Sequence, residues 1–291
     1  MLINFFKGIT NMHDKQYCQF KKYEFLSVLS NEESRLYYDS LANVYDQLYN
    51  DGISLAENSI IRDMLCKHLY KGCKVLDLGC GSGLAYELIS DFLNTNFNYT
   101  GVDISYNMLQ QAQIKYSGFN NVDFYQINME NLSYFNTNTF DAVISLYGSF
   151  SHSLKYKQSI NEIKRVLKPN GIIFIMVYSR FSLRNIFRCM TKFTISSLSE
   201  VQLYQIRKTK GDIFSYARFY TDKSIKIIFH GFRNLEIKGL NACLEIPLLN
   251  QAYLPEEKSR SAKKFLLNES NIISRFKNLT HSLVITGDNI K

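Results

Sequence analysis

The sequence predicts an α/β protein with a doubly wound, seven-stranded and mostly parallel sheet. Between residues 56 and 177, short apolar runs alternate with segments in which apolar residues recur at helical spacing, and this alternation implies parallel strands. A glycine-rich run, residues 79–83, directly follows the first apolar run. The chain has 291 residues, which is enough to bury one large core without disulfides.

The first half of the chain is predicted to begin with an amphipathic helix over residues 30–49. Ser30 and Glu33 form a capping box that satisfies its first backbone amides. Its apolar face is formed by Tyr37, Leu41, Val44 and Leu48. The elements that follow are a helix over 56–69, a strand over 74–79, a helix over 82–93, a strand over 98–103, a helix over 105–116 and a strand over 122–127.

The second half is predicted to complete the sheet and to add two inserts. A turn at 169–171 separates a helix from a buried strand. Residues 180–218 form an insert that we interpret as a cap over the site where a substrate binds. A second insert covers residues 241–280. The predicted elements are a strand over 140–146, a helix over 156–168, a strand over 172–177, a helix over 220–232, and strands over 235–240 and 281–286.

We divide the chain into an N-terminal helical segment, residues 1–54, and a main domain, residues 55–291, that carries both inserts. The chain has only three prolines and no proline-rich linker, so the two parts are expected to fold as one unit.

The run from Val75 to Gly83 predicts an adenosine-binding site. Glycines at alternate positions let the backbone turn from strand to helix and approach a ligand closely. Asp103 follows at the end of the next predicted strand, where a carboxylate can accept hydrogen bonds from ribose hydroxyls. A dinucleotide motif, GxGxxG, would need glycine directly after Gly83, and Leu84 stands there.

This run, VLDLGCGSG, resembles motif I of class I S-adenosylmethionine-dependent methyltransferases at every position. Three further blocks resemble the same family: residues 100–109, 140–145 and 162–171. The segment from Tyr38 to Asp46 is similar to the Y-D-x-x-A-x-x-Y-D segment that covers the cofactor in small-molecule members of the type 11, UbiE-like kind. The resemblance implies a Rossmann-like enzyme with an antiparallel last strand, S-adenosylmethionine as cofactor, and an N-terminal lid.

The resemblance also implies which residues bind the cofactor. Asp77 and the glycine backbone would hold its amino-acid tail, and Asp103 would hold its ribose. Asn128 stands where the family usually has an aspartate for the adenine amine; its alternative role is a helix N-cap. The implied set is Asp77, Gly79, Cys80, Gly81, Gly83, Asp103, Ile104, Met108, Asn128, Met129 and Leu146, with Tyr38 and Tyr45 facing the sulfonium by cation–π attraction. The alternative roles are a turn or cap for the two aspartates and core packing for Tyr45.

The segment from Tyr147 to His152 leaves the fourth predicted strand beside the expected methyl position. His152 is our candidate general base and Tyr147 the second candidate, because a hydroxyl acceptor must lose a proton during methyl transfer. The alternative for His152 is a polar loop residue without catalytic function. The segment lacks the (D/N)PP(Y/F) motif common in methyltransferases of nucleobases, which disfavours that class.

Charge is distributed unevenly along the chain. Residues 1–150 carry 10 Lys+Arg and 16 Asp+Glu, a net −6, while residues 151–291 carry 24 and 10, a net +14. Basic residues recur every fourth position in the first insert, which predicts a helix with a basic stripe: Arg180, Arg184, Arg188 and Lys192. Three interpretations stay open: an anionic acceptor bound by Arg180 and Arg184, an acidic lipid or RNA surface, or a solvated helix flank.

The sequence therefore predicts methyl transfer to an oxygen or nitrogen of a small, anionic metabolite. The alternatives are an RNA methyltransferase and a non-catalytic S-adenosylmethionine-binding subunit. Six cysteines without CxxC or Cys/His spacing indicate neither a metal site nor a disulfide framework, as expected of a cytoplasmic protein. No transmembrane segment is predicted, and we expect a monomer or homodimer.

Overall fold

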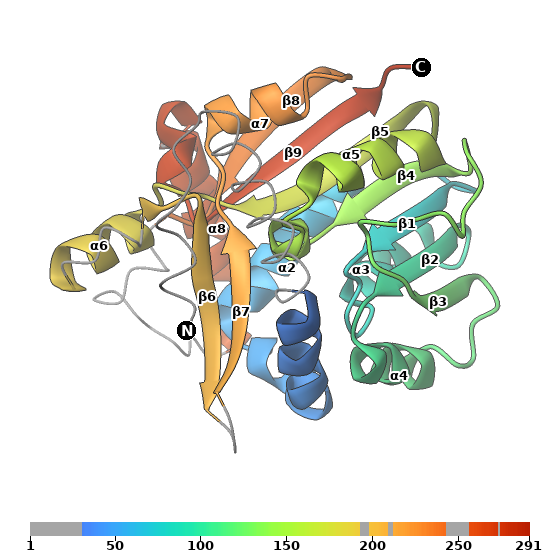
Figure 1. The fold of residues 1–291 in the computed structure, drawn as a ribbon, viewed down its shortest axis with the longest axis horizontal. Coiled ribbons are helices and arrows are strands. Elements are labelled where there is room, and N and C mark those ends of the chain that lie inside the picture. The colour runs from blue at the N-terminus through green and yellow to red at the C-terminus, as the bar shows by residue number, and fades with distance from the viewer. Residues whose placement is uncertain (1–30, 193–197, 209–211, 243–255, 273) are drawn as a thin grey trace, which may run out of the picture.

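The computed structural model describes residues 31–192, 198–208, 212–242, 256–272 and 274–291. A seven-stranded sheet has the order β3-β2-β1-β4-β5-β9-β8, and a separate two-stranded sheet is formed by β6 and β7 (Figure 1). Parallel pairs join β3 through β5, whereas β9 runs antiparallel to both β5 and β8. The predicted doubly wound sheet with an antiparallel last strand is thus confirmed.

Every predicted strand is present. The large sheet consists of β1 Lys74–Leu78, β2 Asn98–Asp103, β3 Val122–Gln126, β4 Phe140–Ser145, β5 Leu167–Tyr178, β8 Phe232–Leu240 and β9 Ser282–Asn289. The α-helices after residue 50 are α2 Gly52–Leu65, α3 Leu84–Leu93, α4 Tyr106–Lys115, α5 Tyr156–Val166, α6 Leu183–Lys192, α7 Asp222–Ile228 and α8 Ser259–Ile272.

The N-terminal segment, residues 31–49, differs from the single long helix that was predicted. An α-helix covers residues 31–41, and two 3-10 turns follow, η2 Ala42–Val44 and η3 Asp46–Tyr49. Ser30 of the predicted capping box lies outside the described residues. Val44 and Leu48 are 40% and 48% exposed, so the predicted apolar face is wrong beyond residue 41. Polar contacts hold this part instead: Asp46 accepts a hydrogen bond of 2.5 Å from the Ser82 hydroxyl.

The predicted turn at residues 169–171 lies inside β5. Helix α5 ends at Val166, and the strand begins at the next residue. The register between β4 and β5 shifts between Phe140 and Ala142, and Asn170 has a φ of +60°. The prediction was a separate turn at these residues, but the structure has a strand with a bulge-like register shift there.

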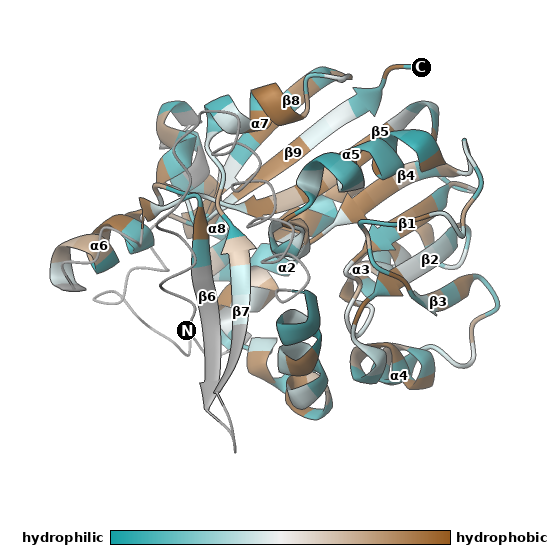
Figure 2. Ribbon diagram, viewed as in Figure 1, coloured by the Kyte–Doolittle hydropathy of each residue, from teal (hydrophilic) through white to brown (hydrophobic). Residues whose placement is uncertain are grey.

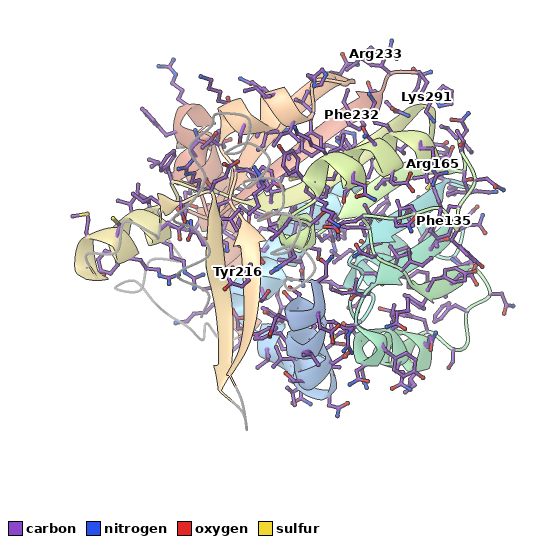
Figure 3. The ribbon with its side chains drawn as sticks, viewed as in Figure 1. Phe135, Arg165, Tyr216, Phe232, Arg233 and Lys291 are labelled. Carbon is purple, nitrogen blue, oxygen red and sulfur yellow. The ribbon has the colours of Figure 1, made fainter. Side chains whose placement is uncertain are left out.

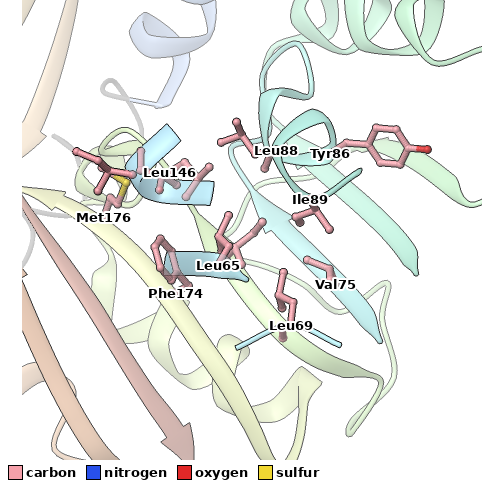
Figure 4. Packing of buried hydrophobic residues seen from close by; sticks show 14 of the residues in the cluster. Leu65, Leu69, Val75, Tyr86, Leu88, Ile89, Leu146, Phe174 and Met176 are labelled. Carbon is pink, nitrogen blue, oxygen red and sulfur yellow. The ribbon is translucent and has the colours of Figure 1, made fainter. Parts of the chain in front are cut away.

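The core has two halves, one on each face of the large sheet. Alternate residues of β1 face opposite sides, so Val75 packs with α2 and α3 while Leu76 packs with α5 and α7. Figure 4 shows the first half, in which Leu65 of α2 lies close to Phe174 of β5, and Ile89 of α3 lies close to Val75 of β1. The central strands are rich in apolar residues, whereas α5 presents a largely hydrophilic outer face (Figure 2). Burial on both faces explains the continuous apolar runs of these strands.

The first insert contributes α6 and an antiparallel hairpin of β6 Val201–Lys208 and β7 Asp212–Arg218. The hairpin stands beside the N-terminal segment, where the hydroxyls of Ser34 and Ser215 are 3.0 Å apart (Figure 1). In the second insert, α8 buries Ala262 and Leu266 in the same core half as α2. Residues 243–255 of that insert lie outside the described part. Among the helices that the structure describes, none has the length and apolar character needed to span a bilayer.

Candidate active site

A pocket lies at the carboxyl ends of β1, β2 and β4, the edge where open α/β sheets bind ligands, and its empty space together with the solvent at its mouth is about 710 Å³. Two groups of side chains line it. One comes from the loops after β1, β2 and β3, and the other from the N-terminal segment and the loop after β4. The lining residues are Asn31, Ser34, Tyr38, Tyr45, Gly79, Gly81, Asp103, Ile104, Met108, Ile127, Asn128, Met129, Tyr147, Ser149, His152 and Ser153.

The loop after β1 brings backbone to the pocket wall. Gly79 has a φ of +72°, and a Cβ there would lie 2.5 Å from the Cβ of Ser149. Its amide donates to the Val102 carbonyl at 2.7 Å, which holds the loop against β2. Gly83 faces away from the pocket, because a Cβ there would meet the Tyr116 ring at 2.5 Å. Two of the three predicted glycines, Gly79 and Gly81, therefore line the pocket, and Gly83 permits packing.

Asp103 ends β2 with its carboxylate in the pocket lining. Its Oδ2 accepts from the Gly81 amide at 2.9 Å, and its Oδ1 accepts from the Ser105 amide at 2.8 Å. Burial raises the pKa of this carboxyl group, and the amide hydrogen bonds oppose that shift. Each carboxylate oxygen keeps further acceptor capacity. The carboxylate is thus fixed in place and can accept from a pair of hydroxyls, as a ribose requires.

Asp77 lies beneath the glycine loop and is not among the lining residues. The Tyr99 hydroxyl donates to its Oδ2 at 2.5 Å, while its Oδ1 is buried without a hydrogen-bond partner in the described structure. Burial raises the pKa of Asp77 to about 7, against the effect of the Tyr99 hydrogen bond, and the nearby Asp103 raises it further. A buried acceptor without a partner fits a ligand that brings a donor, such as a cationic amino group.

The loop after β3 forms the wall at which the adenine ring was predicted to bind. Asn128 lines the pocket, and its Oδ1 accepts from the Glu130 amide at 2.8 Å. This bond closes a turn, whereas the sequence alternative was a helix N-cap. The Asn128 carbonyl keeps one lone pair for a ligand. Ile104, Met108 and Met129 line the same wall as predicted, and Ile127 is a lining residue that the sequence did not reveal.

Tyr147 follows β4 in a strained conformation, with a φ of +49°. Contacts at both ends hold it there: its hydroxyl donates to the Asn58 Oδ1, and its carbonyl accepts from the Tyr178 hydroxyl at 3.0 Å. Burial raises the pKa of the Tyr147 phenol well above its ordinary value. The phenol therefore stays protonated near neutral pH, so Tyr147 can donate a hydrogen bond or present its ring but is unsuited to act as a base.

His152, in η4 Ser149–His152, is a buried side chain that lines the pocket. Its Nδ1 lies 3.1 Å from the Tyr216 carbonyl oxygen, which can only accept, so Nδ1 carries the proton. Its Nε2 is then an acceptor, 3.4 Å from the Tyr38 hydroxyl. Burial lowers the pKa of His152 to about 4, which leaves the ring neutral at neutral pH. The site therefore holds a neutral imidazole with a lone pair on Nε2.

The N-terminal segment closes the pocket opposite the glycine loop. Tyr38 and Tyr45, which were predicted to face the sulfonium, both line it, with ring centroids 6.2 Å apart. Because Tyr45 is half-buried and borders the pocket, core packing alone does not account for it. Asn31 and Ser34 also line the pocket. No pattern in the sequence indicated these two residues, since their partners lie far away along the chain.

The remaining predicted site residues lie outside the lining. Cys80 and Leu146 are buried beside it. Arg180 donates from Nε to the Leu198 carbonyl at 2.7 Å, and its guanidinium lies 5.3 Å from the Phe181 ring centroid. Neither Arg180 nor Arg184 is a lining residue, and no other arginine or lysine is among the described side chains that line the pocket. The described side chains of the basic stripe, Arg180, Arg184 and Arg188, therefore do not line the pocket.

Comparison with known proteins agrees with this geometry. A family model described as a methyltransferase domain matches residues 69–210. The chain is 30% identical over 201 residues to the uncharacterized protein MJ1252 of Methanocaldococcus jannaschii, covering 69% of this chain and 71% of that protein. It is 38% identical over 157 residues to a 2-phytyl-1,4-naphtoquinone methyltransferase of Trichormus variabilis, covering 51% and 66% respectively.

Solved structures share the fold. A SAM-dependent methyltransferase from Methanosarcina mazei matches with a TM-score of 0.53 and 20% sequence identity. The match covers 78% of this chain and 97% of that one.

Proposed function

Because the chain belongs to the class I S-adenosylmethionine-dependent methyltransferases, we propose that it methylates a hydroxyl oxygen of a small, uncharged, ring-bearing acceptor. S-adenosylmethionine is its cofactor and supplies a methyl group on a sulfonium. The observation that carries the proposal is His152: a neutral imidazole with an unprotonated Nε2 lines the pocket, and no described lysine or arginine does.

Several residues would hold the cofactor in this pocket. Asp103 would accept from the ribose hydroxyls, and the Asn128 carbonyl would accept from the adenine amine without the extra strength of a charged acceptor. The unpartnered Oδ1 of Asp77 would accept from the amino group of the tail. Such a contact would favour the ionised carboxylate and thereby reverse the pKa shift that burial causes.

His152 would orient the acceptor and take its proton. An acceptor hydroxyl that donates to Nε2 points its remaining lone pairs toward the methyl group. As the oxygen–carbon bond forms, the electron pair of the sulfur–carbon bond stays on sulfur and the hydroxyl proton passes to Nε2. The positive charge moves from sulfonium to imidazolium, so the net charge of the buried site is unchanged. This balance offsets the weak basicity that the low pKa of His152 implies.

The pocket favours an aromatic acceptor over the anionic one expected from the charge distribution. Three tyrosine rings, Tyr38, Tyr45 and Tyr147, border it together with Ile127 and Met129. Aromatic and apolar walls bind rings, whereas an anion would need a cationic partner. The relative from Trichormus variabilis is named a 2-phytyl-1,4-naphtoquinone methyltransferase, which also supports a ring-bearing acceptor.

The test is a product screen with purified protein and S-adenosylmethionine, analysed by mass spectrometry. The panel contains a naphthoquinol, neutral phenols, phenolic carboxylates and total tRNA. We expect methylated product with the naphthoquinol or a neutral phenol, and at least a tenfold lower turnover for His152→Gln. Product with carboxylates or tRNA alone would overturn the proposal, and tight S-adenosylhomocysteine binding without any product would favour a non-catalytic binding subunit.

A further inference from the structure

Side chains from two distant parts of the chain meet around the His152 ring. Ser34 and Tyr38 come from the N-terminal helix, and Ser215 comes from β7 of the first insert. Ser215 Oγ lies 3.1 Å from Nδ1 of His152, and the Ser34 hydroxyl lies 3.0 Å from that of Ser215. Tyr38 approaches the ring from its other side, with its hydroxyl 3.4 Å from Nε2.

Helical spacing makes this arrangement possible. Ser34 and Tyr38 are four residues apart, so they lie one above the other on one face of the helix. The helix therefore reaches Nδ1 through Ser215 and reaches Nε2 directly. Figure 3 labels Tyr216 on β7 near this helix, and the carbonyl of that residue completes the surroundings of Nδ1.

A further contact on the same helix face supports the docking. Asn31, three residues before Ser34, donates from Nδ2 to Oε2 of Glu130 at 3.1 Å. Glu130 is buried, and its Oε1 accepts from the Ser153 hydroxyl and from the Lys155 amide, each at 3.1 Å. The inner face of the helix is thus joined by polar contacts to the loop that carries His152, and breaking one of them would leave a buried polar group without its partner.

The opposite face of the helix contributes little packing. Leu36 is 39% exposed and Ser40 is exposed. Ser34, in contrast, is buried. The helix is therefore held over the pocket by the polar contacts of its inner face together with Asp39, whose Oδ1 accepts from the Ser105 hydroxyl at 2.6 Å and from the Asn107 amide at 3.1 Å.

We propose that Ser34, Tyr38 and Ser215 are positioning residues for His152, so that docking of the N-terminal helix orders the ring and the ring in turn retains the helix. The catalytic consequence rests on the proposed function, whereas the structural coupling does not. The Tyr38 hydroxyl donates to the Nε2 lone pair of His152, which is the lone pair that an acceptor hydroxyl would use. A hydroxyl acceptor can replace that hydrogen bond when it enters, but an acceptor without a donor cannot.

Amide hydrogen exchange of residues 31–41 tests the coupling without any turnover. The variants are Tyr38→Phe, Ser215→Ala, His152→Gln and the Tyr38→Phe/His152→Gln double variant. We expect each single variant to speed exchange in this helix roughly two- to tenfold. The double variant should exchange no faster than His152→Gln alone, because both changes break the same hydrogen bond. Ser40→Ala, on the exposed face of the same helix, is the matched control: it removes a hydroxyl that donates to the Tyr37 carbonyl at 2.6 Å but keeps the contacts of Ser34 and Tyr38, and it should change exchange less than twofold.

Two further readouts separate positioning from mere stability. Tyr38→Phe should shift the Nε2 nitrogen signal of His152 in NMR spectra, and Ser40→Ala should not. Tyr38→Phe should also lower kcat more than twofold while S-adenosylhomocysteine affinity changes less than twofold, since the ring stays and only the hydroxyl is lost. Wild-type exchange in all single variants, or effects that multiply in the double variant, would overturn the coupling. If the variants change hydrogen exchange as expected but His152→Gln keeps the wild-type kcat, the coupling stands and the proposed catalytic role of His152 is refuted.

Discussion

The two sides of the pocket are built in different ways. The side that we propose binds the cofactor, the cofactor side, consists of loops that follow adjacent parallel strands, and its central contact joins Gly81 to Asp103, 22 residues apart. The side that we propose binds the acceptor, the acceptor side, is assembled from an N-terminal helix, the loop after β4 and an inserted hairpin, and its contact between Ser34 and Ser215 spans 181 residues. The first side is fixed by a local strand-loop-helix motif, and the second depends on how distant segments dock. A shared cofactor side can therefore serve different acceptors.

The largest expected effect concerns the cofactor side. Asp103→Ala removes the acceptors for two ribose hydroxyls, and each hydrogen bond to a charged group contributes about 1.5–3 kcal/mol. We therefore expect S-adenosylhomocysteine affinity to fall at least roughly a hundredfold in calorimetric titration. Asp123→Ala, an exposed carboxylate on neighbouring β3, is the control and should bind as the wild type does. Unchanged affinity in Asp103→Ala would show that the ribose lies elsewhere.

A second effect on the cofactor side is the pH dependence of stability caused by Asp77. Its folded-state pKa is raised to about 7, so it favours the folded state at low pH and this contribution is lost as pH rises toward 7. Asp77→Asn has no carboxyl group to ionise at this position. The unfolding free energy of Asp77→Asn minus that of the wild type should therefore increase by about 4 kcal/mol between pH 4 and pH 8. Denaturant unfolding at both pH values measures this difference, and a constant difference would contradict the burial of an ionisable carboxyl group.

The acceptor side should show the opposite pH dependence. The folded-state pKa of His152 is lowered to about 4, so its contribution to stability is complete above pH 6.5 and is lost as pH falls toward 4. Relative to His152→Gln, the wild type should lose about 3 kcal/mol of unfolding free energy over that interval. If the two proteins lose stability in parallel, the ring is not buried in its neutral form.

The glycine loop should be sensitive to a single methyl group. In Gly79→Ala the new Cβ would lie 2.5 Å from the Ser149 Cβ, at a φ of +72° that favours glycine. We expect about 1–3 kcal/mol of destabilisation together with weaker S-adenosylhomocysteine binding. Gly118→Ala is the control, because a Cβ there meets nothing within 4 Å. Equal stability of both variants would mean that the loop relaxes freely.

The smallest effect tests the basic stripe of α6. Arg184 is not a lining residue, so Arg184→Ala should change KM for the acceptor less than twofold. A rise in this KM of tenfold or more would show that the acceptor contacts the first insert, and it would support an anionic acceptor bound by the arginines.

The sequence predicted the large sheet well because it follows local patterns. Alternating apolar runs located every strand of the seven-stranded sheet but neither strand of the β6–β7 hairpin, and the motif around Gly79 and Gly81 located the loop beside Asp103. The same reasoning failed for residues 42–49, where apolar periodicity suggested a buried helix face that polar docking replaces.

The acceptor side could be predicted only in part. His152 and Tyr147 follow β4 directly, so their position was visible in the sequence. Asn31, Ser34 and Ser215 were not, because a lone serine or asparagine carries no periodic signal and its partner is set by tertiary docking. The basic stripe containing Arg180 was a clear pattern, yet pattern alone does not say which surface a helix presents to a pocket.

We propose that one pocket has a cofactor side at Asp103 and an acceptor side at His152. The most direct test measures S-adenosylhomocysteine affinity and turnover together for Asp103→Ala and His152→Gln, using the acceptor found in the product screen. We predict that Asp103→Ala loses affinity at least roughly a hundredfold, while His152→Gln keeps it within twofold and loses turnover at least tenfold. Equal losses of affinity in both variants, or full turnover in His152→Gln, would contradict this division of the site.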